Sequence, residues 1–253
     1  MNSPASANIE DYLRRASTAS REQPARDHAL TRSLHPETPA ADALQVRDAH
    51  GGEVEHAPDD VFRGIRTRLL SLGGAKNFTT LVTAVSPRSG ASFVARNLAA
   101  AFAFEASKSA LLIDCNVRRA SQHVALGIEP TRGGLLDYLE QPQRTPQQVL
   151  YRTRVPRLSL LPAGQPRATT GELFSAARMR ALVDALRVQY PDRYLLLDGP
   201  ALGGSPDALL LSEMVDYVVI VAAFGRDSAA SINQAIAGLD PKKVAGAIFN
   251  HPV

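Results

Sequence analysis

Between residues 59 and 253, short apolar runs alternate with segments of helical periodicity, and this alternation narrows the choice of fold more than any other feature. Several runs are apolar at nearly every position, which is typical of strands buried on both faces of a parallel sheet. We predict strands at 80–85, 110–114, 158–161, 194–198, 217–223 and 244–249. The alternation predicts an α/β fold, in which a doubly wound, mainly parallel sheet has helices on both faces.

The segments between these runs have the apolar spacing of amphipathic helices. We predict helices at 59–72, 91–106, 172–189, 206–214 and 228–239, with shorter ones around 135–139 and 146–151. The apolar side chains of the first helix form a single stripe that can pack against a neighbour. That stripe consists of Val61, Phe62, Ile65, Leu69 and Leu70.

Residues 1–58 are rich in proline and histidine and poor in strongly apolar side chains. Such a segment buries too little surface to offset the entropy lost on ordering, so we predict a disordered tail. Ile9, Tyr12 and Leu13 have the spacing of one amphipathic turn, which predicts a short docking helix at 9–15. The alternative is a fluctuating turn, since so short a helix is unstable alone. The chain therefore divides into a tail, 1–58, and one domain, 59–253.

Composition excludes several classes of protein. A formal net charge of +3 on 253 residues does not indicate nucleic acid or a membrane surface as a partner. A single cysteine excludes an internal disulfide framework and a multi-cysteine metal site, so we expect no structural metal and a reducing compartment. No apolar run approaches the roughly 18 residues of a membrane span, and the N-terminus lacks the apolar segment of a secretory signal. We expect a cytoplasmic protein without direct membrane insertion.

The turn Val85–Ser92, which reads VSPRSGAS, joins a predicted strand to a predicted helix. A phosphate-binding loop needs small residues at a helix N-terminus, then a lysine, then a Ser or Thr hydroxyl for Mg²⁺. Gly90 and Ser92 fit this pattern, but Ala91 occupies the lysine position. Taken alone, this segment is explained at least as well as a Ser-Gly turn that caps a helix and binds no phosphate.

Two predicted strands end in an acidic residue, Asp114 in LLIDCNVRR and Asp198 in YLLLDGP. A carboxylate at the end of a buried strand is unfavourable unless it is hydrogen-bonded or near a metal ion. Ligands of doubly wound sheets bind at the carboxyl ends of the strands, so both aspartates beside Ser92 indicate a Mg²⁺-nucleotide site. Either aspartate alone could instead cap a helix or turn. Cys115 is interpreted as a small buried residue rather than a reactive thiol.

Several segments, taken in order, resemble the ATPase domain of the bacterial tyrosine kinases of capsule and exopolysaccharide synthesis, which are relatives of the MinD/ParA P-loop ATPases. The segments are GASFVARNLAAAFA (90–103), DCNVRRASQH (114–123), LPAG (161–164), ELFSAARMRALVDAL (172–186), LLLDGPALGGSPDALLL (195–211) and IFN (248–250). They resemble the Walker A loop and helix, the second Walker motif DxDxRRPSxH, a linking strand and helix, the Walker B segment, and a final strand end. This resemblance implies a MinD/ParA-like P-loop NTPase fold for 59–253.

The resemblance also implies roles for individual residues. Nucleotide would contact the loop and the end of the last strand, namely Pro87, Arg88, Ser89, Gly90, Ala91, Ser92, Phe93 and Asn250. Mg²⁺ would be bound by Ser92, Asp114 and Asp198, and the two aspartates would also be the catalytic residues. Asp60, Arg63 and Arg66 resemble the family's Glu-x-x-Arg-x-x-Arg oligomerisation pattern, within an assembly helix at 59–72; the alternative is a solvated charged face.

The chain departs from the family pattern at the site itself. The Walker A lysine is Ala91, the glycine usual after the loop proline is Arg88, and the second Asp of DxD is Asn116. Ala120 replaces the proline after the paired arginines, and no tyrosine follows Tyr217, whereas most family kinases end in a tyrosine cluster. Phosphoryl transfer depends on positive charge around the phosphates. These departures therefore predict impaired catalysis and weak binding of Mg-ATP or Mg-ADP.

Three hypotheses remain open. The first is a pseudokinase-like regulatory component of exopolysaccharide or capsule synthesis, which acts with a membrane chain-length or export protein at the inner face of the cell membrane. The second is a weak ATPase or protein tyrosine kinase in which Arg88 replaces the missing lysine. The third is a MinD/ParA-type positioning ATPase. We expect a homo-oligomer and no nucleic-acid partner.

Overall fold

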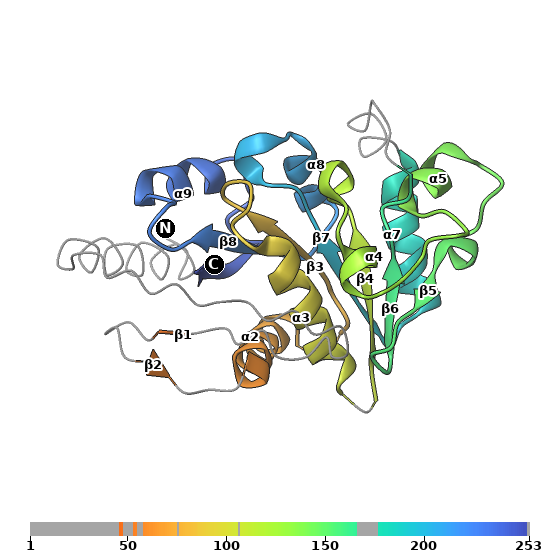
Figure 1. Ribbon diagram of the computed structural model, residues 1–253, viewed down its shortest axis with the longest axis horizontal. Coiled ribbons are helices and arrows are strands. Elements are labelled where there is room, and N and C mark those ends of the chain that lie inside the picture. Colours follow the sequence, from red (N-terminus) through yellow and green to blue (C-terminus); the bar gives the residue numbers. More distant parts are fainter. Residues whose placement is uncertain are drawn as a thin grey trace.

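The central element of the fold is a seven-stranded sheet with the strand order β5-β6-β4-β7-β3-β8-β9 (Figure 1). The computed structural model describes residues 46–47, 53–54, 58–74, 76–105, 107–165 and 177–251. The strands are β3 (Thr79–Ala84), β4 (Ser109–Asp114), β5 (Tyr151–Arg152), β6 (Leu158–Leu161), β7 (Arg193–Asp198), β8 (Tyr217–Ala223) and β9 (Val244–Asn250). All neighbouring pairs are parallel except β5 with β6. The predicted mainly parallel sheet is confirmed.

Helices follow most strands, as the alternation in the sequence predicted. They are α2 (Pro58–Gly73), α3 (Ala91–Ala103), α4 (Gln122–Ala125), α5 (Leu135–Glu140), α7 (Ala177–Gln189), α8 (Asp207–Glu213) and α9 (Ala229–Ile236). Short 3₁₀ turns lie at η1 (Val117–Arg119), η2 (Pro146–Val149) and η3 (Leu202–Gly204). No helix in these described ranges has the length and hydropathy needed to cross a membrane.

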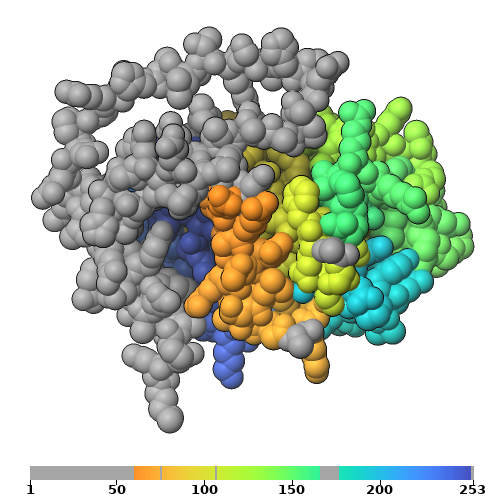
Figure 2. Space-filling view, turned by 90° about the horizontal axis from the view of Figure 1, so that it is seen from below, coloured from red at the N-terminus to blue at the C-terminus, as the bar shows by residue number. Residues whose placement is uncertain are grey.

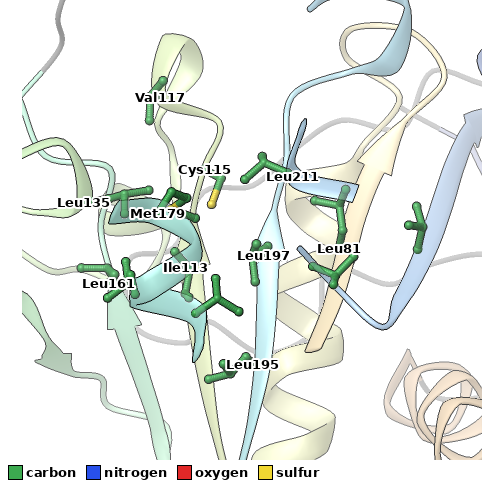
Figure 3. Packing of buried hydrophobic residues seen from close by; sticks show 14 of the residues in the cluster. Leu81, Ile113, Cys115, Val117, Leu135, Leu161, Met179, Leu195, Leu197 and Leu211 are labelled. Carbon is green, nitrogen blue, oxygen red and sulfur yellow. The ribbon is translucent and has the colours of Figure 1, made fainter. Parts of the chain in front are cut away.

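Two apolar cores, one on each face of the sheet, hold the helices in place. Successive strand residues alternate between them because side chains of a strand point to opposite faces. Leu81, Ile113, Leu195 and Leu197 point to the core formed with α5, α7, α8 and α9, and Figure 3 shows them in one cluster with Met179 of α7. The opposite core contains the neighbouring strand residues together with the apolar faces of α2 and α3. The sheet is therefore doubly wound, as predicted.

One predicted element is partly wrong. The helix expected at 146–151 is a 3₁₀ turn that ends at Val149, and Tyr151 begins the edge strand β5, where it pairs with Leu160. The Tyr151 hydroxyl accepts from the Arg132 amide at 2.6 Å and donates to the Gly133 carbonyl at 3.0 Å. These contacts hold the chain extended at this point. The short helix α4 was not predicted either.

The N-terminal predictions fall largely outside the described residues. This holds for the disordered tail, the docking helix at 9–15 and, further along, the first residues of the helix expected at 172–189. Within the tail the structure describes a short antiparallel pair, β1 (Val46–Arg47) with β2 (Glu53–Val54), which the sequence pattern did not indicate.

Candidate functional site

The loop after β3 makes a tight turn into α3 at the carboxyl edge of the sheet. Arg88 and Gly90 both have positive φ values, 66° and 90°, and Gly90 is the N-cap of α3. The left-handed region is unfavourable for residues with a Cβ, so the glycine suits its position and the arginine is strained. Arg88 stands where the resemblance described above implies glycine, a residue that adopts this conformation without strain. The strand, turn and helix expected of a phosphate-binding loop are all present.

Asn250, at the end of β9, is joined to this loop. Its side-chain amide donates to the Ser89 carbonyl at 3.0 Å and is buried. A Cβ on Gly90 would lie 2.1 Å from Asn250 Nδ2, so only glycine allows this approach. The predicted nucleotide-binding residues Ser89, Gly90 and Asn250 are therefore brought together, and the Asn250 amide is bonded to the loop backbone.

A second set of bonds anchors the loop to the end of β8. Asp227 accepts from the hydroxyls of Ser86 and Ser89 and from the Ala223 amide. Arg226 donates to the Ser86 hydroxyl at 3.0 Å and the Ser89 hydroxyl at 2.8 Å. Burial acts to raise the pKa of Asp227, but these hydroxyl and amide donors, with Arg226, outweigh it and hold the pKa below its usual value.

Sequence reasoning missed both residues of this anchor. The available signal was the sequence Gly-Arg-Asp-Ser directly after an apolar strand run, at the edge of the sheet where ligands bind. That signal is weak because Asp and Arg in such a turn are usually solvated.

Ala91 is the first residue of α3 and is 7% exposed. Its methyl group belongs to the core between α3 and the sheet, so the lysine position carries no charge. Of the other predicted loop residues, Pro87 and Arg88 are exposed. The Phe93 ring makes an edge contact with Phe62 of α2, with centroids 6.1 Å apart.

Asp114 and Asp198 end the adjacent parallel strands β4 and β7 in direct register, and both are fully buried. Asp198 accepts from the Ser92 hydroxyl at 3.1 Å. Asp114 Oδ2 accepts from the Ser121 and Gln122 amides at 3.2 and 3.1 Å. The structure thus brings together all three predicted metal-binding residues.

Burial of two neighbouring carboxylates disfavours their charged forms. Burial and the nearby Asp114 carboxylate raise the pKa of Asp198 to about 7, although hydrogen bonds from Gln122 and Ser92 act against this. Burial also raises the pKa of Asp114. Burial, with both carboxylates, raises the pKa of the Cys115 thiol well above its usual value, which agrees with an unreactive cysteine.

The donor set fits a Mg²⁺ ion. P-loop NTPases hold Mg²⁺ with a loop Ser or Thr and a Walker B aspartate, here Ser92 and Asp198. Asp114 Oδ1 is buried and has no hydrogen-bond partner, so it is an oxygen that a cation or its water could satisfy. When bound, such an ion neutralises charge on the phosphate oxygens of a nucleotide.

Gln122 is a further residue of this site that sequence reasoning missed. Its Nε2 donates to Asp198 Oδ2 at 2.6 Å and to the Ser92 carbonyl at 2.9 Å. The family pattern DxDxRRPSxH leaves this position unspecified, and a lone glutamine in a polar segment has no other signature. Gln122 is fully buried.

The predicted oligomerisation residues lie on α2, which is visible in orange on the surface in Figure 2. Arg63 NH1 lies 3.3 Å from Asp60 on the same helix, and both side chains are exposed. Arg66 instead turns inward and donates to the Ala101 carbonyl at 2.8 Å, near the end of α3. Asp60 and Arg63 are thus accessible to a neighbour, while oligomerisation itself stays a prediction.

Known proteins resemble this chain in sequence. No family model matches the chain. One relative is EpsB of Ralstonia solanacearum, a protein named as a tyrosine-protein kinase. It is 33% identical to this chain over 200 residues, which cover 76% of this chain and 26% of EpsB. The tyrosine-protein kinase CpsD of Streptococcus agalactiae is 27% identical over 168 residues, covering 66% of this chain and 71% of CpsD. The homologues of this chain are bacterial tyrosine kinases.

Solved structures of tyrosine kinases agree with the sequence matches. The kinase domain of the Escherichia coli tyrosine kinase Etk has a TM-score of 0.71 and 25% identity, covering 77% of this chain and 76% of that domain. The septum site-determining protein MinD of Pyrococcus horikoshii, solved with Mg-ADP, has a TM-score of 0.52 and 19% identity and supports the fold alone. The resemblance to tyrosine kinases with a MinD/ParA-like P-loop fold is confirmed. The chain spans about a quarter of the length of the EpsB relatives.

Proposed function

We propose that this chain is a pseudokinase-like regulatory component of exopolysaccharide or capsule synthesis, which acts with a membrane chain-length or export protein. It binds Mg-nucleotide weakly or not at all. Homology to bacterial tyrosine kinases supports the fold and the ancestry of the site. The motif resemblance described above is what supports the polysaccharide role and the membrane partner.

The observation that carries this proposal is Ala91 at the lysine position. Its methyl group is packed between α3 and the sheet, so no charge is delivered to the β- and γ-phosphates from this position. Removing one preorganised stabiliser of this kind costs roughly 3–4 kcal/mol, or about 10²–10³ in rate. Asn116, at the second Asp of the family motif, removes a further negative ligand.

The rest of the site keeps the arrangement of a nucleotide site. The turn around Gly90, the Ser92 hydroxyl and the aspartate pair are all in place. Backbone amides at the start of α3 can still attract phosphate weakly. A folded scaffold whose contacts with its partner depend little on nucleotide accounts for both the missing lysine and the otherwise complete site.

Calorimetry with Mg-ADP and Mg-ATP tests the nucleotide part of the proposal. We expect weak or undetectable binding to the unmodified protein and at least about tenfold tighter binding to Ala91→Lys, because the lysine restores positive charge over the phosphates. Arg68→Ala, on the exposed face of α2, is the matched control and should behave as the unmodified protein. Steady ATP turnover by the unmodified protein, abolished in Asp198→Ala, would overturn the proposal.

A second candidate is a weak ATPase or tyrosine kinase that uses an arginine in place of the lysine. Arg88 favours it, because the side chain is exposed and stands in the loop itself. Arg226 also reaches the loop through the hydroxyls of Ser86 and Ser89. This candidate requires Arg88→Ala to weaken Mg-ATP binding, and unchanged affinity in that variant would contradict it. The MinD/ParA-type positioning role has only the shared fold in its favour.

A further inference from the structure

One glutamine joins the groups that a cation would use at the carboxyl ends of β4 and β7. Gln122 is fully buried, and its backbone N–H donates to Asp114 Oδ2 at 3.1 Å. Its side-chain Nε2 donates to Asp198 Oδ2 at 2.6 Å and to the carbonyl of Ser92 at 2.9 Å. A primary amide has two N–H groups, so both donors of this side chain are used.

Arg96 of α3 determines which end of the Gln122 amide faces the carboxylate. Its NH1 lies 3.5 Å from Gln122 Oε1. A guanidinium can only donate, so the amide oxygen must face Arg96 and the nitrogen must face Asp198. The reversed amide would put an oxygen against two acceptors, Asp198 and the Ser92 carbonyl, which is unfavourable. The neighbouring groups therefore fix the orientation of the Gln122 amide, with its nitrogen toward Asp198.

We propose that Gln122 is an internal substitute for the divalent cation, so that this chain keeps the site between Ser92, Asp114 and Asp198 assembled without a metal ion. The amide places partial positive charge beside the carboxylate oxygen that a metal ion would approach. It does so from a side chain that is always present, whereas a metal ion arrives with its ligand. The inference goes beyond the proposed function and is tested without nucleotide, so that the two can fail separately.

A cation and the Gln122 amide compete for the same side of Asp198. Asp198 Oδ1 accepts from the Ser92 hydroxyl and Oδ2 accepts from Gln122, and each oxygen keeps a second lone pair. Gln122 Nε2 also lies 2.9 Å from the Ser92 carbonyl, so a cation that approaches Ser92 and Asp198 from the side of the amide must displace it. Asp114 Oδ1 is the buried oxygen without a donor, and it is the remaining attraction for a cation.

Two substitutions separate the role of the amide from general packing. Gln122→Glu keeps the shape, removes both donors and adds a third carboxylate beside Asp114 and Asp198. Gln122→Leu removes the amide without adding charge. Gln143→Glu introduces the same change in charge on an exposed glutamine and is the matched control. Each protein is stripped with a chelator, and Mn²⁺ binding is then measured by calorimetry alongside thermal unfolding with and without Mn²⁺.

We expect Mn²⁺ to bind Gln122→Glu and Gln122→Leu at least about tenfold more tightly than it binds the unmodified protein or Gln143→Glu, because neither variant keeps a donor against Asp198 Oδ2 and the Ser92 carbonyl. We also expect Gln122→Glu to unfold at a lower temperature in chelator and to recover when Mn²⁺ is added, because a cation offsets the added negative charge. Equal Mn²⁺ affinity in Gln122→Leu and the unmodified protein would overturn the proposal, whatever the affinity of Gln122→Glu. If Gln122→Glu is unfolded both in chelator and with Mn²⁺, the test rests on Gln122→Leu. Tighter Mn²⁺ binding than in the unmodified protein then supports the proposal, and equal binding overturns it.

Discussion

Asp114 and Asp198 lie directly opposite each other at the carboxyl ends of two neighbouring parallel strands, and both are shielded from solvent. Each carboxylate therefore disfavours the ionised form of the other, and the surrounding protein offers polar donors rather than water. This pairing makes the stability of the fold sensitive to pH in a direction opposite to that of an ordinary salt-bridged aspartate.

The first prediction concerns that pH dependence, measured in chelator. The folded-state pKa of Asp198, about 7, lies above its usual value of 3.8, so the folded protein holds a proton that the unfolded chain has lost. The free energy of unfolding should therefore fall as pH rises from about 4 to about 7, by on the order of 2 kcal/mol between pH 5 and pH 7, and level off above. Urea unfolding across this range measures it.

Asp198→Asn should flatten this decline and raise the free energy of unfolding at pH 8 relative to the unmodified protein. Asp192→Asn removes a carboxylate whose side chain is 79% exposed and serves as the control. A decline that is unchanged in Asp198→Asn would show that the buried pair is not its source.

The second prediction concerns the strained loop residue Arg88, which has a φ of 66°. A left-handed conformation costs a residue with a Cβ about 1–2 kcal/mol, and glycine avoids most of this cost. We expect Arg88→Gly to increase the free energy of unfolding by up to about 1 kcal/mol. Arg88→Ala keeps the strain and should not be stabilised; a gain of equal size in both variants would contradict a backbone origin.

The third prediction separates clash from backbone strain at Gly90. Gly90 and Gly74 both have positive φ, 90° and 64°, but only at Gly90 would a Cβ strike a neighbour, the Asn250 amide. We expect Gly74→Ala to lower the free energy of unfolding by about 1 kcal/mol. Gly90→Ala should lower it by about 2 kcal/mol more, because the buried bond from Asn250 to the Ser89 carbonyl is also lost. Similar losses in the two variants would show that Asn250 does not restrain the loop.

The fourth prediction concerns Cys115, which directly follows Asp114 and is fully buried in the apolar core of Figure 3. Its raised pKa and its burial both keep the reactive thiolate scarce. We expect a thiol reagent at pH 8 to modify the folded protein far more slowly than the urea-unfolded protein. The rate should follow the unfolded fraction as urea is added. Rapid labelling at low urea would reveal an opening of the site that precedes unfolding.

The fifth prediction concerns assembly through α2. If exposed Asp60 and Arg63 face a second subunit, Arg63→Glu should lower the mass in light scattering while the unfolding temperature of the subunit stays nearly unchanged. Arg66→Ala should instead cost about 1 kcal/mol of stability, because its guanidinium bonds the Ala101 carbonyl within the same chain. An identical mass for the unmodified protein and Arg63→Glu would remove the assembly role from this pair.

The sequence was sufficient to predict the other strands of the sheet and the strand ends that carry Asp114 and Asp198, because continuous apolar runs mark strands buried on both faces. It also indicated the loop around Gly90. It did not indicate β5, since two residues are too few to show a period. Gln122, Arg226 and Asp227 were missed for a different reason: a polar residue has no periodic signature, and its role depends on which strand ends the topology brings beside it.

The place of Ala91 in the fold also bears on how this chain can change. An alanine codon becomes a lysine codon through at least two base changes, and the shortest routes encode threonine or glutamate in between. Threonine would add branched bulk to a side chain that is 7% exposed at the start of α3. Glutamate would suit the helix N-terminus but repel the phosphates. Under the proposed function, restoring the lysine therefore requires passing through a residue that suits this position less well than alanine does.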